Sequence, residues 1–240
     1  MDEAVYRVMA HVEDRHWWFR GRRAVIGALL ARAAVPPGTA VLDAGCGTGR
    51  NLELYRRIGP ASGVDPSPDA VSFCRARGLS DVRLGDARQL PFEDERFGLV
   101  AATDVLEHVA DDVAALAQMR RVAAPGARLL LTVPAYAWLW SAEDDRLRHH
   151  RRYTLRGLRR VAEAGGWAPA FGTYFNSLLF PAIAVARKVP HRRQDRPELE
   201  RTPAALDGML SLPMRLEAAV IRKGLPLPAG VSVGLVCRTA

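Results

Sequence analysis

Short apolar runs alternate with stretches of helical spacing along most of the chain. Five runs read as strands: Ala40–Asp43, Ala61–Asp65, Val82–Leu84, Phe97–Thr103 and Ala127–Val133. Strands separated by helices form right-handed βαβ units and lie parallel in one sheet. Together with two later strands, this pattern predicts an α/β fold in which helices cover both faces of a mostly parallel, seven-stranded sheet.

The two ends of the chain depart from this alternation. Residues 1–33 have helical spacing up to the turn at Pro36-Pro37-Gly38, and the segment after the fifth strand is more varied. We expect four parts: an N-terminal helical cap (1–35), an α/β core (36–175), a helical insertion that is a lid or an interface (176–228) and a last strand (229–240). The later elements expected are helix Leu155–Ala164, strand Ala168–Tyr174, helix Asn176–Lys188, charged linker Val189–Arg201, helix Leu206–Lys223 and strand Val231–Arg238.

Composition narrows the class of protein. Apolar residues make up 49% of the chain, and no apolar run approaches the ~18 residues of a membrane span. The N-terminus carries no signal-peptide pattern, and the three cysteines form no CxxC pair, so we expect a cytoplasmic protein. No His, Cys, Asp or Glu group has metal-ligand spacing, and no metal is expected.

Positive charge is concentrated in one segment. The net charge is +8, and seven arginines without any acidic residue lie between Arg146 and Arg160. Such a run is often only a solvated face. A nucleic acid, an anionic membrane or a phosphorylated small molecule is the other interpretation.

The most informative motif is a glycine-rich turn between the first strand and the next helix. Gly45, Gly47 and Gly49 alternate with other residues, and Asp65 ends the following strand, 20 residues after Gly45. Glycines let the backbone approach a ligand closely, and a carboxylate at the second strand can accept both hydroxyls of a ribose. We therefore expect a ligand that contains ribose.

The spacing of these glycines is not that of a dinucleotide site, whose third glycine position is Arg50 here. With Asp43 ahead of it, the motif resembles the first motif of class I S-adenosylmethionine-dependent methyltransferases. Three further segments resemble ubiquinone- and menaquinone-type members: Gly85–Phe92, Phe97–Val109 and Arg121–Ala127. The resemblance covers about residues 38–133 and implies the Rossmann-like fold of that class.

The resemblance also implies S-adenosylmethionine as the cofactor and a set of residues that hold it. Asp43 and the turn Gly45, Cys46, Gly47 and Gly49 would hold the methionine end. The ribose would contact Asp65 and Pro66, the adenine Asp86 and Ala87, and the sulfonium Thr103 and Asp104.

Methyl transfer from a sulfonium requires a positioned acceptor and, where needed, removal of a proton. Histidine suits a base near neutral pH, so the catalytic candidates are His108, His149 and His150, with Tyr153 nearby. Aromatic and basic residues are candidates for binding the acceptor, although aromatics are more often core: Trp17, Trp18, Arg20, Tyr136, Trp138, Arg148, Arg151 and Arg152.

Several functions fit these motifs. We favour O-methylation of an anionic, lipid-like or secondary-metabolite acceptor, because O-methylation is the more frequent of the two chemistries. The segments HWWFRGRR, VPAYAWLWSAEDD and HHRRYT resemble a bacterial subgroup that acts on lipid-linked or secondary-metabolite acceptors. The alternative is C-methylation of a prenyl diphosphate gripped by arginines. A nucleic-acid methyltransferase is disfavoured because Thr103–Leu106 has no (N/D)PP(Y/F) motif. The third hypothesis is a non-catalytic module that keeps the fold, and the intact cofactor motifs argue against it.

Two kinds of association are also expected from the sequence. The apolar stretch Leu178–Ala186 is followed by Arg187-Lys188 and Arg192-Arg193. Such a stretch could lie on an anionic membrane. A lid over the site or a homodimer contact is the competing interpretation.

Overall fold

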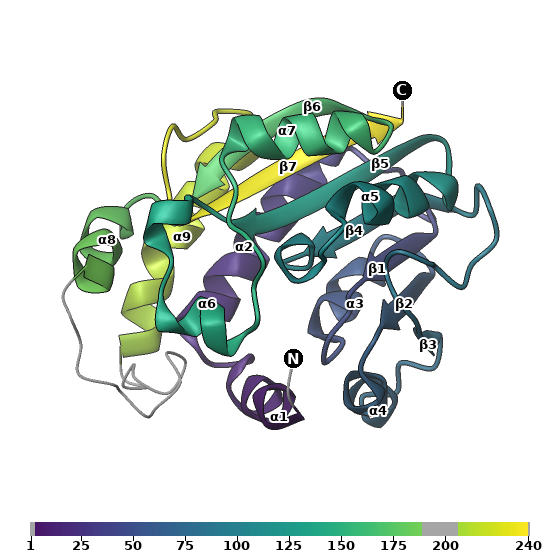
Figure 1. Cartoon of the computed structure of the whole chain (residues 1–240), viewed down its shortest axis with the longest axis horizontal. Helices are drawn as coiled ribbons and strands as arrows, with labels where there is room; N and C mark the ends of the chain where they lie inside the picture. The colour runs from purple at the N-terminus through teal and green to yellow at the C-terminus, as the bar shows by residue number, and fades with distance from the viewer. Residues whose placement is uncertain (1–2, 189–205, 240) are drawn as a thin grey trace.

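One sheet of seven strands organises the computed structural model, which describes residues 3–188 and 206–239 (Figure 1). The strand order is β3-β2-β1-β4-β5-β7-β6, and only β7 pairs antiparallel with its neighbours. This confirms the predicted mostly parallel α/β sheet. The strands are β1 Val41–Ala44, β2 Ala61–Asp65, β3 Val82–Leu84, β4 Phe97–Thr103, β5 Ala123–Pro134, β6 Trp167–Phe175 and β7 Ser232–Thr239.

Helices cover both faces of the sheet because its central strands are apolar on both sides. Side chains of α5 and α7 pack on one face, with Leu116 and Leu158 fully buried. On the other face lie α2, α3, α4 and α9. The helices are α1 Glu3–Val12, α2 Trp17–Ala33, α3 Arg50–Tyr55, α4 Pro68–Ala76, α5 Asp112–Arg121, α6 Ala142–Arg146, α7 Leu155–Ala164, α8 Phe180–Lys188 and α9 Asp207–Arg222, with short turns η1 Leu106–His108 and η2 Ala137–Leu139.

The N-terminal segment forms two helices rather than one continuous stretch. His16 begins α2, and its imidazole accepts a hydrogen bond from the backbone of Trp18 at 3.3 Å. The break lets α1 turn across the edge of the sheet at which β1 and β2 end, close to α4 (Figure 1). Tyr6 on α1 therefore reaches Asp65, and the N-terminal helix becomes part of the wall of a cavity.

The two helices of the expected insertion lie in different places. α9 packs along α2, where Met214 fits against the bare backbone of Gly21 and Ile221 is fully buried. α8 contributes Ile183 to the cavity wall. The expected linker Val189–Arg201 lies outside the described residues. In the described part of the chain, no helix has the length and apolar character needed to cross a membrane.

Candidate active site

A cavity of about 990 Å³ opens at the carboxyl ends of β1, β2 and β4. This is the edge at which ligands bind in open α/β sheets. Its wall runs from Tyr6, Asp65 and Asp86, past Asp104, to Trp18 and Ile183. The cavity is therefore long enough to bring a nucleoside-containing ligand and a second molecule to the end of β4.

The glycine turn adopts backbone conformations that the sequence motif predicts. Gly45, Gly47 and Gly49 have φ of +86°, +54° and +84°, a region that L side chains rarely adopt. A Cβ on Gly45 would lie 2.4 Å from Val105, whereas one on Gly47 would meet no atom within 4 Å. The turn is thus packed tightly from behind, and its Gly47 side is open to a ligand.

Asp65 is buried at the end of β2 and is held by three donors. Its carboxylate accepts hydrogen bonds from the backbone of Gly47 (2.8 Å) and Ser67 (3.0 Å) and from the hydroxyl of Tyr6 (3.2 Å). Burial raises the pKa of Asp65, while the two backbone N–H groups oppose that rise. Each carboxylate oxygen can accept two bonds, so one of the four acceptor positions remains for a ribose hydroxyl, and a second hydroxyl would take the position that Tyr6 occupies.

Asp43 is the least satisfied acidic residue at the site. It is 1% exposed, and neither carboxylate oxygen has a hydrogen-bond partner among the described residues. Burial raises its pKa well above the usual value, and Arg22 opposes the rise. Asp43 does not line the cavity but lies directly before the glycine turn. An orphaned buried acceptor at this place fits the ammonium group of S-adenosylmethionine.

Asp86 and Ala87 line the cavity, but Asp86 already has a partner. Arg88 donates to its carboxylate from the backbone and from the guanidinium, both at 2.7 Å. The Arg88 side chain lowers the pKa of Asp86. Because this ion pair is half exposed, it contributes little stability, and an adenine amine can replace Arg88 at small cost.

The end of β4 is connected to α2 by Arg22. This guanidinium donates to the backbone oxygen of Thr103 at 3.0 Å and forms an ion pair with Asp104 at 3.0 Å. Asp104 also accepts from Thr132, and Asn51 donates to the Thr103 hydroxyl. Thr103 and Asp104 therefore have fixed positions in the cavity wall, and their contact with the sulfonium stays a prediction.

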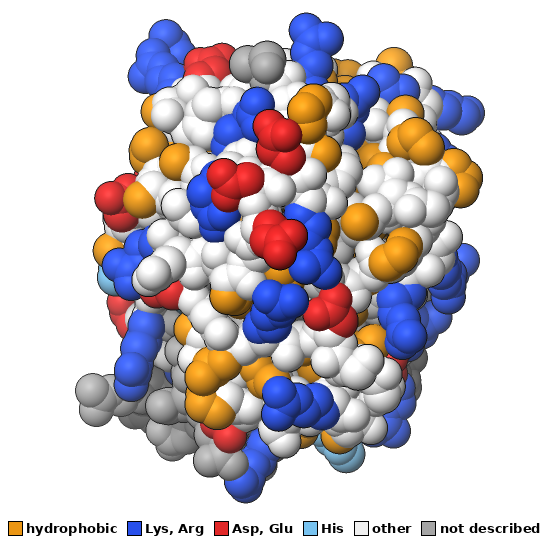
Figure 2. Space-filling view, turned by 90° about the vertical axis from the view of Figure 1, so that its right-hand side faces the viewer, with side chains coloured by type: hydrophobic (Ala, Val, Ile, Leu, Met, Phe, Trp, Pro, Cys, Tyr) orange, Lys and Arg blue, Asp and Glu red, His pale blue; other side chains and the backbone are white. Residues whose placement is uncertain are grey.

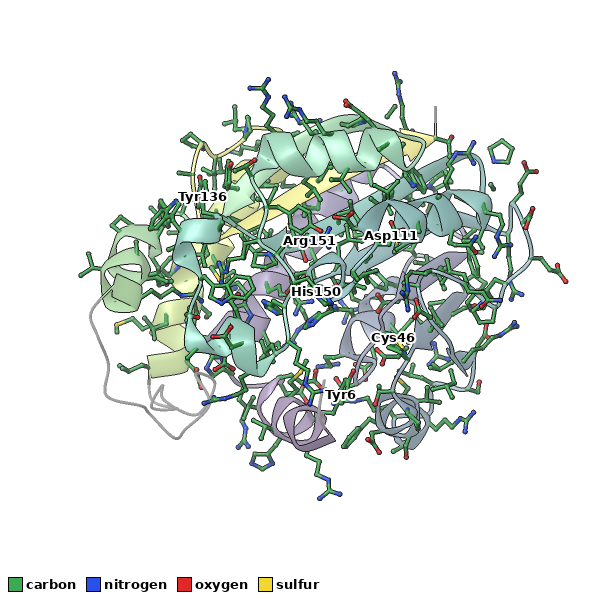
Figure 3. The ribbon with its side chains drawn as sticks, viewed as in Figure 1. Tyr6, Cys46, Asp111, Tyr136, His150 and Arg151 are labelled. Carbon is green, nitrogen blue, oxygen red and sulfur yellow. The ribbon has the colours of Figure 1, made fainter. Side chains whose placement is uncertain are left out.

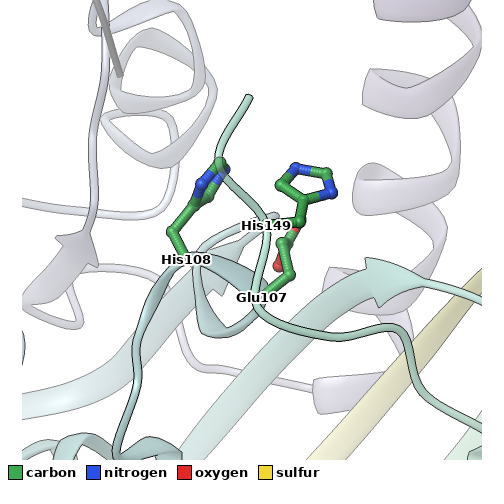
Figure 4. Close-up of side chains that lie close together, drawn as sticks. All are labelled: Glu107, His108 and His149. Atoms are coloured by element: carbon green, nitrogen blue, oxygen red, sulfur yellow. The ribbon is translucent and has the colours of Figure 1, made fainter. Parts of the chain in front are cut away.

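Two histidines and a glutamate converge beside this region (Figure 4). The rings of His108 on η1 and His149 after α6 pack edge to face with centroids 4.6 Å apart, and the Glu107 carboxylate lies within reach of both. Asp144 accepts a hydrogen bond from Nδ1 of His149 at 2.8 Å. An ionised carboxylate only accepts, so Nδ1 carries the proton, and Nε2 is the ring nitrogen that can accept a proton when the imidazole is neutral.

Asp144 is the fixed centre of the loop that carries His149. It caps α6 through the backbone and hydroxyl of Ser141, and Arg152 donates to it at 2.8 Å. Burial raises the pKa of Asp144, but the hydrogen bonds from His149 and Arg152 outweigh it and hold that pKa below the usual range. The carboxylate therefore stays charged and orients the His149 ring.

Only some of the residues expected from the sequence line the cavity. Trp17, Trp18, His108, His149, His150 and Arg152 do. The expected acceptor-binding or catalytic residues that do not line it are Arg20, Tyr136, Trp138, Arg148, Arg151 and Tyr153.

Four of these side chains have other contacts in the structure. Tyr153 is buried and donates to Asp112 at 2.7 Å, and Arg151 forms an ion pair with the same carboxylate at 2.9 Å. Tyr136 stacks on Tyr174 and on Trp138 near α8 (Figure 3). Of the three arginines expected to grip a diphosphate, Arg152 alone lines the cavity, already paired with Asp144.

The structure adds site residues that sequence reasoning missed. Tyr6, Glu13 and Arg22 reach the cavity from the first two helices, and Glu13 accepts from Thr48 of the glycine turn at 2.7 Å. Arg23 also lines the cavity. The HWWFRGRR segment was a signal for this region, but it drew attention to its aromatics and to Arg20 rather than to the two arginines behind them.

We expect His108 to make folding stability depend on pH. Burial, with the nearby charge of His149, lowers its pKa from 6.5 to about 4. Between these values the unfolded chain binds the extra proton, so stability falls as pH is lowered from 6.5 to 4. Between pH 6.5 and pH 4, the free energy of unfolding measured in urea should fall for the parent by on the order of 2 kcal/mol more than for His108→Asn. His11→Asn is the control and should lose as much stability as the parent. An equal fall in the free energy of unfolding for the parent and His108→Asn would contradict the prediction.

Comparisons with known proteins agree with this geometry. Residues 42–131 match the family described as methyltransferase domain. An uncharacterized 37.1 kDa protein in transposon TN4556 of Streptomyces fradiae is 33% identical over 211 residues, covering 84% of this chain and 57% of that protein. Demethylmenaquinone methyltransferase of Mycobacterium bovis is 35% identical over 161 residues, covering 65% and 62%. The chain thus spans about three fifths of the length of these relatives.

Solved structures extend the agreement to the whole fold. A S-adenosylmethionine-dependent methyltransferase from Thermotoga maritima has a TM-score of 0.59 and 17% identity, covering 98% of this chain and 100% of its own. At this identity the likeness shows the fold alone. With the domain match, it implies S-adenosylmethionine as the cofactor. The chain therefore carries a methyltransferase domain in the class I S-adenosylmethionine-dependent methyltransferase fold.

Proposed function

We propose that this protein transfers the methyl group of S-adenosylmethionine to a hydroxyl of a small molecule with an apolar body. The observation that carries this is the single cavity in which Asp65 and the glycine turn at one end are continuous with His149, Trp18 and Ile183 at the other. A cofactor held at the first end directs its sulfonium toward the end of β4, where the acceptor would lie.

The cofactor would be held by groups that the fold already fixes. Asp65 would accept the ribose hydroxyls, and Asp43 would face the ammonium end. Arg23 is a cation in the cavity wall next to the glycine turn, and its pKa is lowered by burial and by the charge of Arg50. A ligand carboxylate would pair with this buried guanidinium and offset the cost of burying its charge. We therefore assign Arg23 to the carboxylate of the cofactor.

His149 is our choice for the group that accepts the hydroxyl proton. Its Nε2 lone pair is available, and Asp144 would stabilise the imidazolium that forms. His108 is less suited because burial holds its pKa at about 4, which makes it a weak base at neutral pH. His150 is exposed, and Tyr153 is committed to Asp112.

The charges of the cavity favour an apolar acceptor over a diphosphate. Two of the arginines near His149 are paired within the protein, Arg152 with Asp144 and Arg146 with Glu143 at 3.1 Å. Trp17, Trp18 and Phe19 supply apolar wall instead. A relative named for demethylmenaquinone is consistent with a lipid-like acceptor. C-methylation of a prenyl diphosphate therefore has less support.

A nucleic-acid substrate is also less supported. On the face shown in Figure 2, acidic and basic side chains are interspersed rather than gathered by sign. Electrostatic binding of nucleic acid requires a surface of one sign, which this one face does not provide. Membrane contact and a homodimer remain predictions; Leu178 and Val185 are 61% and 66% exposed, and Arg192-Arg193 lies outside the described residues.

The experiment is incubation with labelled S-adenosylmethionine and two panels, one of hydroxylated apolar molecules such as catechols and hydroquinones, the other of prenyl diphosphates. We expect label in an O-methylated product of the first panel. Label only in the second panel would establish C-methylation. A protein that binds the cofactor but labels neither panel would contradict the proposed activity, and label in an added transcript would indicate a nucleic-acid substrate instead.

A further inference from the structure

Three side chains in the middle of the cavity form a donor set that sequence spacing did not indicate. Glu107, His108 and His149 each offer one ligand atom, and these atoms lie within 4.8 Å of one another (Figure 4). His149 is 41 residues from His108 along the chain. Two imidazoles and one carboxylate are a ligand set that proteins use for Zn²⁺ and other first-row divalent metals.

Glu107 lacks the partner that a buried carboxylate requires. The residue is 1% exposed, and its Oε2 has no hydrogen-bond partner among the described residues. Leaving such a group unsatisfied costs about 1–3 kcal/mol, and more when it is charged. The backbone oxygen of Glu107 accepts from His150 at 2.7 Å, which ties η1 to the loop of His149. The backbone of Glu107 is thus fixed beside the loop of His149, while its Oε2 keeps the capacity to accept.

Both histidines also have a hydrogen-bond partner outside the cluster. Asp144 accepts from Nδ1 of His149 at 2.8 Å, and the His108 ring interacts with the backbone of Leu147. Metal-bound histidines almost always donate their second N–H to a carboxylate or a backbone oxygen, which fixes the ring. This outer shell is already present here.

The surrounding charges do not oppose a cation. Two arginines lie near Glu107, but each has its own carboxylate: Arg22 pairs with Asp104 at 3.0 Å and Arg152 with Asp144 at 2.8 Å. Neither arginine is therefore paired with the Glu107 carboxylate. Bonds to Zn²⁺ of about 2.0–2.1 Å place its ligand atoms about 3.3 Å apart. Small side-chain rotations would bring the three ligand atoms of the cluster to that separation.

We propose that Glu107, His108 and His149 bind a first-row divalent transition metal, with Zn²⁺ the best-fitting ion and a fourth position open to the cavity. The proposal concerns binding and does not rest on the proposed function. A metal on Nε2 of His149 would prevent that nitrogen from accepting a proton. The metal-bound protein should therefore differ from the metal-free protein in its methyl transfer.

The test is calorimetric titration of the metal-stripped full chain with ZnCl₂, and with CoCl₂ followed by visible absorption. We expect one site per chain and the absorption of Co²⁺ in a tetrahedral or five-coordinate N/O site. Glu107→Gln, His108→Ala and His149→Ala should each weaken binding about 100-fold or more. Asp144→Asn should weaken it about 10–100-fold through the lost outer shell.

His150→Ala and His11→Ala are the matched controls, since both remove an imidazole outside the cluster, and both should bind Zn²⁺ like the parent. Glu107→Gln keeps the size of the side chain, and its thermal unfolding verifies that it folds. Absence of one-to-one binding, or equal losses in His150→Ala and His149→Ala, would overturn the proposal. Either result leaves the test of methyl transfer unaffected.

Discussion

Replacement of Asp65 by alanine is expected to weaken S-adenosylmethionine binding by about 100-fold or more. The ribose would lose two hydrogen bonds to a charged acceptor, each contributing about 1.5–3 kcal/mol. The N–H groups of Gly47 and Ser67 would also lose their acceptor, so the turn would be less well ordered. Calorimetric titration with the cofactor measures the effect directly.

Two further variants make this result specific. Asp69→Ala removes a carboxylate from the first turn of α4, outside the cavity wall, and should bind the cofactor as the parent does. Asp65→Asn keeps the shape but only one acceptor oxygen, and we expect an intermediate loss. An Asp65→Ala protein that unfolds at the parent temperature and binds with parent affinity would refute the assignment of the ribose site.

Replacement of His149 by alanine should lower kcat by about 10²–10⁴-fold, the usual contribution of a general base. The affinity for S-adenosylmethionine should stay within about twofold, because the ring is not expected to contact the cofactor. Asp144→Asn, which removes the charge that orients the ring, should lower kcat less. The measurement is initial rate with the acceptor that the panels identify, with EDTA present.

The exposed His11 on α1 provides the control, since His11→Ala removes an imidazole without touching the cavity wall. A second comparison is His108→Asn, which should lower kcat less than His149→Ala because His108 is the weaker base. Parent rates in His149→Ala, or a larger loss in His108→Asn, would show that the proton goes elsewhere.

The core of the fold could be predicted because its strands are short apolar runs separated by clear turn signals. Gly45 and Asp65 lie at the ends of two such strands, and adjacent parallel strands end at the same edge. The place of the cofactor site follows from that rule alone. That prediction does not require knowledge of which distant helices pack together.

Contributions from α1 and α2 depend on contacts that local patterns do not contain. Tyr6 meets Asp65 across 59 residues, and Arg22 meets the backbone of Thr103 across 81. The Glu107, His108 and His149 cluster likewise depends on how the loop after β5 folds back on η1. A search for ligand spacing along the sequence could not find it.

The sequence pattern treats the arginine-rich segment as one basic region, whereas in the structure its residues have different partners. Around Tyr153 the backbone is extended and bridges Ala135, so successive side chains point to opposite sides. Arg152 consequently faces the cavity and Asp144, while Arg151 and Tyr153 turn toward Asp112. A count of basic residues cannot distinguish these directions.

The central claim is that this cavity holds a nucleoside carrying an activated sulfur, and a crystal structure with S-adenosylhomocysteine tests it most directly. We predict both ribose hydroxyls within hydrogen-bond distance of Asp65, the sulfur beside Asp104 and the carboxylate facing Arg23. A ligand whose ribose lies away from Asp65, or whose sulfur is remote from the end of β4, would contradict it.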